Sequence, residues 1–155
     1  MPSVIKYSEL KIKIMLFNTS YRNKDYEKKS NEMLGKAYSL FEKIKLKGIG
    51  SGRLVINEFS ATLKPKNMQS TDTNYANIEL RPKGIIIHFA NRLDRYSWTI
   101  PYYRLTIFST ETFSIHCNGE FIKFKKSQHY ADNKKFIKKM MNFKNEALNL
   151  EYYDG

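Results

Sequence analysis

The sequence predicts an α+β protein in which a bent antiparallel sheet, or partly open barrel, is closed by a C-terminal helix and preceded by an N-terminal strand and helix. Short β-rich runs follow one another after Gly52 at roughly the spacing of an antiparallel meander. On either side of them, apolar residues recur at the 3–4-residue steps of a helix. Because a single open sheet cannot bury both its faces, we expect the last helix to plug one end of it.

The first 52 residues are predicted to be a strand–helix extension that packs on a domain spanning 53–155. Residues 4–17 alternate in the manner of a half-buried strand, with Leu10, Ile12, Ile14 and Leu16 on one face. A single helix is expected from about Asn23 to Lys47. The glycines between residues 48 and 52 are expected to end this helix.

The sheet itself is predicted from short runs bounded by Gly, Pro, Asn or Asp. These runs are Arg53–Leu63, Ala76–Leu80, Gly84–Ala90, Tyr96–Ile100, Tyr102–Ser109, Thr112–Cys117 and Glu120–Lys125. Asn118-Gly119 predicts a tight two-residue hairpin, because both residue types tolerate positive φ. The closing helix is expected from Asp132, as the N-cap, to Leu148.

Composition narrows the class of protein. The 155 residues are enough for one domain with a core, and 27 Lys and Arg against 15 Asp and Glu give a net charge of +12. Apolar runs fall far short of the roughly 18 residues that a membrane helix needs. A single cysteine, Cys117, excludes an internal disulfide and a multi-cysteine zinc site. We expect a cytoplasmic protein.

The spacings that carry catalysis are not found in the sequence. The glycine-rich stretch 48–52 follows a helix and precedes a strand, the reverse of a phosphate-binding loop. His116 and Cys117 are adjacent and would point to opposite faces of a strand, so at most one of them could join His88. We therefore predict a non-enzymatic protein without a metal or cofactor.

A cluster of arginines and aromatic residues is the first candidate for binding a protein partner, because Trp, Tyr and Arg dominate interface hot spots. The alternative is that alternate residues of these strands fill the core. The candidates are Arg92, Arg95, Trp98, Tyr102, Tyr103 and Arg104.

A basic stretch is the second candidate. Residues 121–144 contain eight lysines and one acid, Asp132. Such a stretch could bind nucleic acid or an anionic membrane surface, or it could be a solvated face of a lysine-rich chain. The candidates are Lys123, Lys125, Lys126, Lys134, Lys135, Lys138 and Lys139. A homodimer is a further alternative, since the edges of a sheet can pair between two chains.

Residues 53–148 resemble the bacterial pleckstrin-homology-like (PH-like) proteins. The resemblance rests on the run Gly84-Ile-Ile-Ile-His-Phe, on Tyr96-Ser-Trp-Thr-Ile-Pro, and on Phe113-Ser-Ile-His-Cys with the helix after it. It implies a binding module with a protein partner. The Trp of eukaryotic PH helices is absent from residues 132–148, and the basic pattern of phosphoinositide-binding members does not follow Arg53.

Overall fold

The computed structural model describes residues 15–66, 68–69 and 72–153. Of the strand expected over residues 4–17, residues 4–14 lie outside them. The elements, in chain order, are β1 (Leu16–Asn18), α2 (Lys24–Leu34), α3 (Leu40–Lys45), β2 (Leu54–Phe59), β3 (Tyr75–Arg81), β4 (Gly84–Asn91), β5 (Asp94–Pro101), the 3-10 turn η1 (Tyr102–Arg104), β6 (Thr106–Ser109), β7 (Thr112–Cys117), β8 (Glu120–Lys125), α4 (Gln128–Asp132) and α5 (Lys134–Tyr153).

The eight strands form one antiparallel sheet in the order β1-β5-β4-β3-β2-β8-β7-β6. Strand β2 joins its two halves, since it pairs with β3 through Val55 and with β8 through Ile56. The register shifts between Ile56 and Glu58, so β2 bends there. Strands β1 and β6 end the order without pairing with each other, and the described sheet is thus a partly open barrel.

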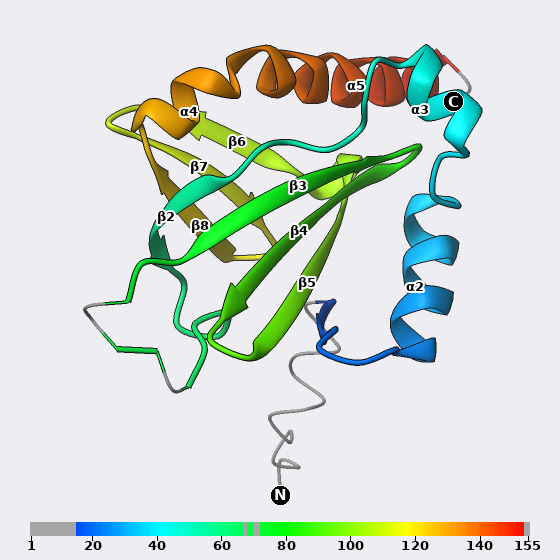
Figure 1. The fold of residues 1–155 in the computed structure, drawn as a ribbon. Coiled ribbons are helices and arrows are strands. Elements are labelled where there is room, and N and C mark those ends of the chain that lie inside the picture. The colour runs from blue at the N-terminus through cyan, green and yellow to red at the C-terminus, as the bar shows by residue number, and fades with distance from the viewer. Residues whose placement is uncertain (1–14, 67, 70–71, 154–155) are drawn as a thin grey trace, which may run out of the picture.

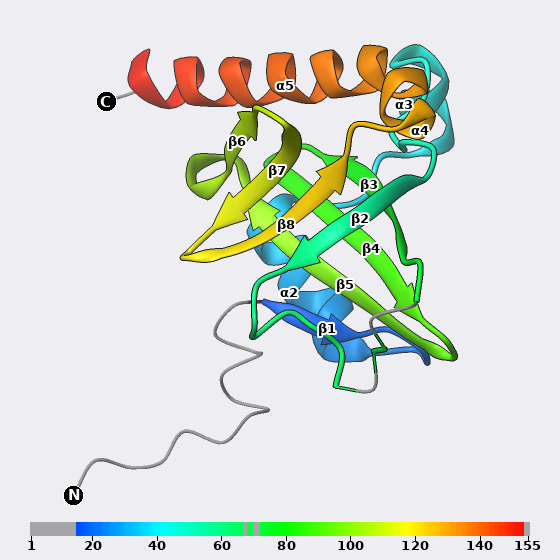
Figure 2. The ribbon, with the colours of Figure 1, turned by 90° about the vertical axis from the view of Figure 1, so that its left-hand side faces the viewer.

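The helices lie on different sides of this sheet. Figures 1 and 2 show α5 across the upper end of both halves, whereas α2 stands against β4 and β5 on the side away from β6–β8. Ile137 and Met140 of α5 are buried in the same core as the inward side chains of both sheet halves. The expected α+β architecture with a closing C-terminal helix is confirmed.

The two-residue hairpin turn predicted at Asn118-Gly119 is confirmed. Asn118 and Gly119 both have positive φ, 53° and 81°, between β7 and β8. The residues on either side, Cys117 and Glu120, pair directly across the hairpin. This turn twists in the same sense as the strands it joins, which sets the register of the whole β7–β8 pair.

The prediction of one helix from Asn23 to Lys47 is wrong, because the helix stops at Leu34. Asn23 does cap its start, accepting a hydrogen bond from the Tyr26 amide, but Gly35 ends it with a φ of 80°. The Leu34 carbonyl then accepts a hydrogen bond from the Lys83 amide. A new helix, α3, begins after Ser39.

The C-terminal helix also differs from its prediction. It begins earlier, as α4, and Asp132 is the last residue of that turn rather than an N-cap. Asn133 separates α4 from α5. Its buried amide accepts a hydrogen bond from the Gly52 amide and donates to the carbonyls of Arg53 and His129. The expected strand Tyr102–Ser109 is shortened by η1, where the Leu105 amide bonds the Tyr102 carbonyl.

Candidate interaction surface

The arginine–aromatic cluster does not form one surface. Trp98 and Tyr102 are buried, which corrects their assignment to a binding patch. Trp98 lies between its strand partners Ile87 and Leu16, on the face of β5 that meets the core. The Tyr102 hydroxyl donates a hydrogen bond of 3.0 Å to the Arg81 carbonyl. Both residues therefore hold the fold together.

The exposed members of the cluster lie at opposite ends of β5. Arg92 belongs to the turn between β4 and β5, and Arg95 is the second residue of β5. Tyr103 and Arg104 come after the other end of the strand, roughly 20 Å away at the rise of an extended chain. There the Arg104 guanidinium lies 5.4 Å from the Tyr103 ring centre and donates a hydrogen bond to Asn118.

Part of the basic stretch is engaged in contacts within the chain. Lys123 lies 3.5 Å from a Glu58 carboxylate oxygen. Lys126 donates a hydrogen bond to the Thr110 carbonyl and lies over the Tyr130 ring. Both lysines have partners within the chain, so they contribute less to a polyanion surface than the sequence predicts.

The assignment of Lys139 to polyanion binding is corrected by its contacts within the fold. Its ammonium group donates hydrogen bonds to the carbonyls of Leu46 and Gly48, at 3.0 and 3.1 Å, and to that of Lys47. Leu46 is the C-cap of α3, whose carbonyl has no later amide of the helix to bond, and the other two carbonyls follow it directly. Lys139 therefore ties α5 to α3.

The four remaining lysines predicted to bind a polyanion are exposed. Lys125 ends β8, and Lys134, Lys135 and Lys138 lie on the first two turns of α5. Among the described residues, no ion pair includes any of these four. A basic face of α5 thus exists, but it is smaller than predicted.

Helix α3 carries the most conspicuous exposed apolar side chains. Leu40, Phe41 and Ile44 have exposed fractions of 75%, 76% and 69%. The sequence places Phe41 and Ile44 on the buried face of a long helix. Because the chain breaks at Gly35 and restarts at Ser39, this face turns outward instead.

The short helix α3 is held at both ends. At its start, Ser39 and Glu42 form a capping box, in which each side chain accepts a hydrogen bond from the other residue's amide. At its end, Lys139 bonds the last carbonyls. Six residues would not form a stable helix alone, so these contacts fix the direction in which Phe41 points.

A groove runs between α3 and α5 and has a volume of about 410 Å³. Its apolar lining comes from Tyr38, Phe41, Leu46, Pro82, Phe143 and Ala147. Glu42, Glu146 and Lys45 complete the wall. Burial, followed by the negative charges of Glu42 and Glu146, raises the pKa of Tyr38.

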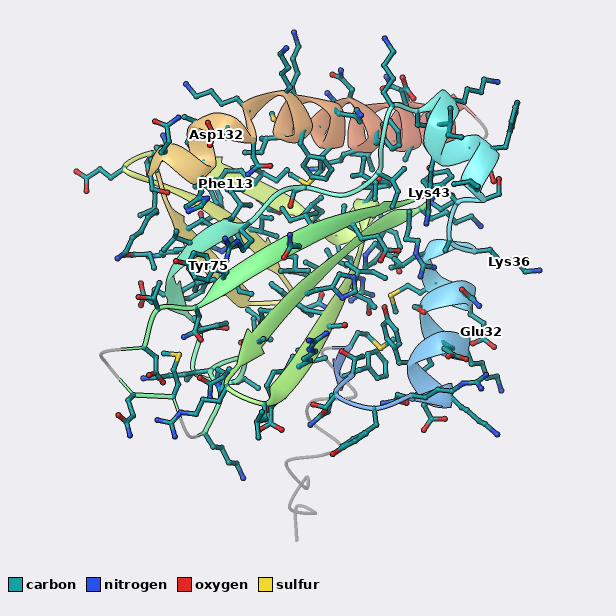
Figure 3. All side chains as sticks on the ribbon, in the orientation of Figure 1. Glu32, Lys36, Lys43, Tyr75, Phe113 and Asp132 are labelled. Atoms are coloured by element: carbon teal, nitrogen blue, oxygen red, sulfur yellow. The ribbon has the colours of Figure 1, made fainter. Side chains whose placement is uncertain are left out.

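The surroundings of this groove are basic. Lys43, Lys45 and Lys47 are exposed on and just after α3, and Lys36 precedes it. In Figure 3, Lys36 extends away from the ribbon between α2 and α3. We name the set formed by Leu40, Phe41, Ile44 and the groove lining the α3–α5 surface.

Cys117 is buried, and His116, next to it in β7, is partly buried. Burial raises the pKa of the Cys117 thiol to about 11 despite the opposing charge of Arg104. Burial and then Lys123 lower the pKa of His116, whose ring packs on Phe121. Within the described ranges, no three His, Cys, Asp or Glu side chains gather as metal ligands would.

Comparison with protein-family models, with curated proteins and with solved structures found no match for this chain. None of the helices in the part of the chain that the structure describes combines the length and the apolar character required to cross a bilayer.

Proposed function

We propose that the chain is a non-enzymatic, PH-like binding module, located in the cytoplasm, whose α3–α5 surface docks on a protein partner. The observation that carries this proposal is the exposure of Leu40, Phe41 and Ile44 on one six-residue helix. Contiguous apolar side chains next to a groove are typical of interaction sites. The order of a four-strand meander, a three-strand meander and a closing helix supports the PH-like part of the proposal.

The charges around the surface favour a partner of complementary character. Four exposed lysines, Lys36, Lys43, Lys45 and Lys47, lie on α3 or close to it in the chain, and they outnumber the two acids of the groove wall, Glu42 and Glu146. A second copy of the chain docked through the same face would bring these lysines together, which opposes self-association. The partner we propose therefore presents apolar side chains flanked by Asp or Glu.

Photo-cross-linking in cells that express the chain tests this proposal. Benzoylphenylalanine is placed at position 41 or 44, and the adducts are identified by mass spectrometry. The matched control carries the same group at Leu93, an apolar residue at the β4–β5 turn that is 94% exposed. We expect positions 41 and 44 to capture one common protein that position 93 does not capture.

The captured protein is then purified and titrated with the chain. We expect Phe41→Asp with Ile44→Asp to weaken binding by at least about tenfold, because such hot-spot side chains carry most of an interface's energy. Leu93→Asp should leave the affinity unchanged. The proposal fails if all three positions yield the same adducts, or if the double variant binds the purified protein as tightly as the unchanged chain.

Nucleic-acid binding is a second candidate, favoured by the free lysines of α5. Fluorescence anisotropy of a labelled random-sequence duplex, titrated at several salt concentrations, measures it. The triple variant Lys134→Ala, Lys135→Ala and Lys138→Ala should reduce the log–log salt slope by about three units. Lys139 is kept, since it caps α3. A control with Lys24→Ala, Lys28→Ala and Lys64→Ala removes the same charge from other exposed positions, and equal slopes in the two variants would exclude the α5 face.

A further inference from the structure

A line of hydrogen-bonded polar side chains crosses the outer face of β3, β4 and β5. Glu79 accepts hydrogen bonds from Arg81 and from His88 Nε2, the latter at 3.0 Å. On the other side of the ring, His88 Nδ1 lies 2.8 Å from Ser97 Oγ, which lies 2.9 Å from Thr19 Oγ1. His88 and Ser97 face each other directly across β4 and β5.

The charge of Glu79 sets the direction of its hydrogen bond with His88. Burial alone would raise the pKa of Glu79, but the hydrogen bonds from His88 and Arg81 outweigh it and lower the pKa to about 2. The ionised carboxylate can only accept, so His88 Nε2 carries the hydrogen. The other ring nitrogen, Nδ1, is paired with the Ser97 hydroxyl, which can donate or accept.

This arrangement positions His88 rather than activating Ser97. The Ser97 residue is 1% exposed and its hydroxyl is paired with both His88 and Thr19, so a substrate cannot reach it. The His88 side chain, by contrast, is 37% exposed. Its ring is held at both nitrogens and presents its edge to the space above the sheet.

That space is a groove of about 500 Å³, a size typical of small-molecule sites. It lies where α2 leaves the outer face of the sheet uncovered. In the view of Figure 3, Tyr75 and helix α2 stand on either side of β4 and β5. The lining residues are Thr19, Tyr26, Arg53, Tyr75, Asn77, His88, Phe89, Ala90, Arg95, Tyr96 and Ser97.

The groove is basic and aromatic. Its lining includes Arg53 and Arg95 but no acid. The Arg53 guanidinium stacks on the Tyr75 ring at 4.9 Å, which limits its freedom before any ligand arrives. Among the described residues, neither arginine takes part in an ion pair. Two arginines in the lining of one groove that has no carboxylate are suited to a tetrahedral dianion.

We propose that this groove binds a small phosphate monoester, with Arg53 and Arg95 on the phosphate, His88 at the floor and the tyrosines beside the organic part. The proposal goes beyond protein docking, because the groove lies on the outer face of β3–β5 and shares no residue with the α3–α5 surface. The phosphate could belong to a nucleotide or to another metabolite, since both present the same group.

Isothermal titration calorimetry with four probes tests the proposal at about 0.15 M salt. The probes are AMP, ribose 5-phosphate, inorganic phosphate and adenosine. We expect the phosphate esters to bind with dissociation constants below about 1 mM, and adenosine not to bind. Tighter binding of AMP than of ribose 5-phosphate identifies a nucleotide, and equal binding identifies a sugar phosphate or a similar metabolite.

Two variants with the same loss of charge locate the site. Arg53→Gln with Arg95→Gln should weaken binding of the phosphate esters at least about tenfold, since two charge-assisted contacts are lost. Arg92→Gln with Arg104→Gln removes two exposed arginines outside the groove and should change the affinity little. All four side chains are exposed, so thermal unfolding should confirm that both variants fold. Absence of binding by every phosphate probe, or equal affinities in the two variants, overturns the proposal.

Discussion

The ammonium group of Lys139, on α5, lies 3.0 Å from the carbonyl oxygen of Leu46, at the end of α3. This contact joins positions 93 residues apart and satisfies carbonyls that a helix end leaves unpaired. It also explains why a lysine within the basic stretch is half-buried rather than solvated. The orientation of the α3–α5 surface thus depends on a residue that sequence reasoning assigns to polyanion binding.

Replacement of Lys139 should loosen α3. For Lys139→Met we expect a loss of about 1–2 kcal/mol in the free energy of unfolding, because three charge-assisted hydrogen bonds are lost while the apolar stem is kept. Urea unfolding measures this loss. Lys138→Met, at the exposed neighbouring position, should stay within about 0.5 kcal/mol of the unchanged chain. Equal effects of the two substitutions would contradict the capping role.

The low pKa of Glu79 makes part of the stability depend on pH. Its pKa falls from an ordinary value of 4.5 to about 2 on folding. A carboxyl whose pKa is lowered on folding stabilises the fold above its unfolded value, and this contribution is lost as pH falls from about 5 toward 2. The full contribution is roughly 3 kcal/mol.

Glu79→Gln isolates this contribution. The variant should be less stable at pH 7, since Arg81 is left buried without its carboxylate. The stability difference from the unchanged chain should shrink as the pH is lowered from about 5 toward 2, as measured by urea unfolding at each pH. Glu32→Gln, an exposed control on α2, should follow the unchanged chain throughout. A constant difference across this range would contradict the assignment.

Gly84 is required by close packing. A Cβ at this position would overlap the Ile100 carbonyl oxygen, the Leu34 side chain and the Pro101 backbone. We expect Gly84→Ala to destabilise the fold by about 1–3 kcal/mol, since rigid backbone must shift. Gly50→Ala meets no atom within 4 Å and serves as the control in the same thermal unfolding measurement. Equal unfolding temperatures for the two variants would show that the contact between α2 and β4 is looser than described.

Because the expected N-terminal helix breaks at Gly35, we predict very different losses of stability when two apolar residues of similar size are replaced. Leu34→Ala should cost about 2–5 kcal/mol because Leu34 is fully buried. Ile44→Ala should change the free energy of unfolding by no more than about 0.5 kcal/mol, because Ile44 is already exposed. Urea unfolding compares the two. A large loss for Ile44→Ala would mean that this side chain is buried in the monomer.

The elements read most accurately from the sequence are those that depend on local signals. The bounds of β7 and β8 agree with their predictions to the residue, because the alternation of each strand ends at the Asn118-Gly119 turn. The arginine–aromatic cluster shows the limit of such signals. Alternation tells which residues share a face of β5, but it does not tell that Trp98 faces the core.

The α3–α5 surface and the groove on the outer face of β3–β5 could not be predicted from the sequence, because both depend on contacts between residues that are distant in the chain. Helical periodicity continues past Gly35, yet the bond from the Lys83 amide to the Leu34 carbonyl ends α2 and leaves Phe41 exposed. The groove likewise brings together Arg53 and Arg95, which are 42 positions apart in the chain. The α+β class, the meander and the closing helix follow from local periods and turn residues, and these are properties of short stretches of sequence. The exposure of each side chain follows instead from what packs against its face, and this depends on residues far away in the chain.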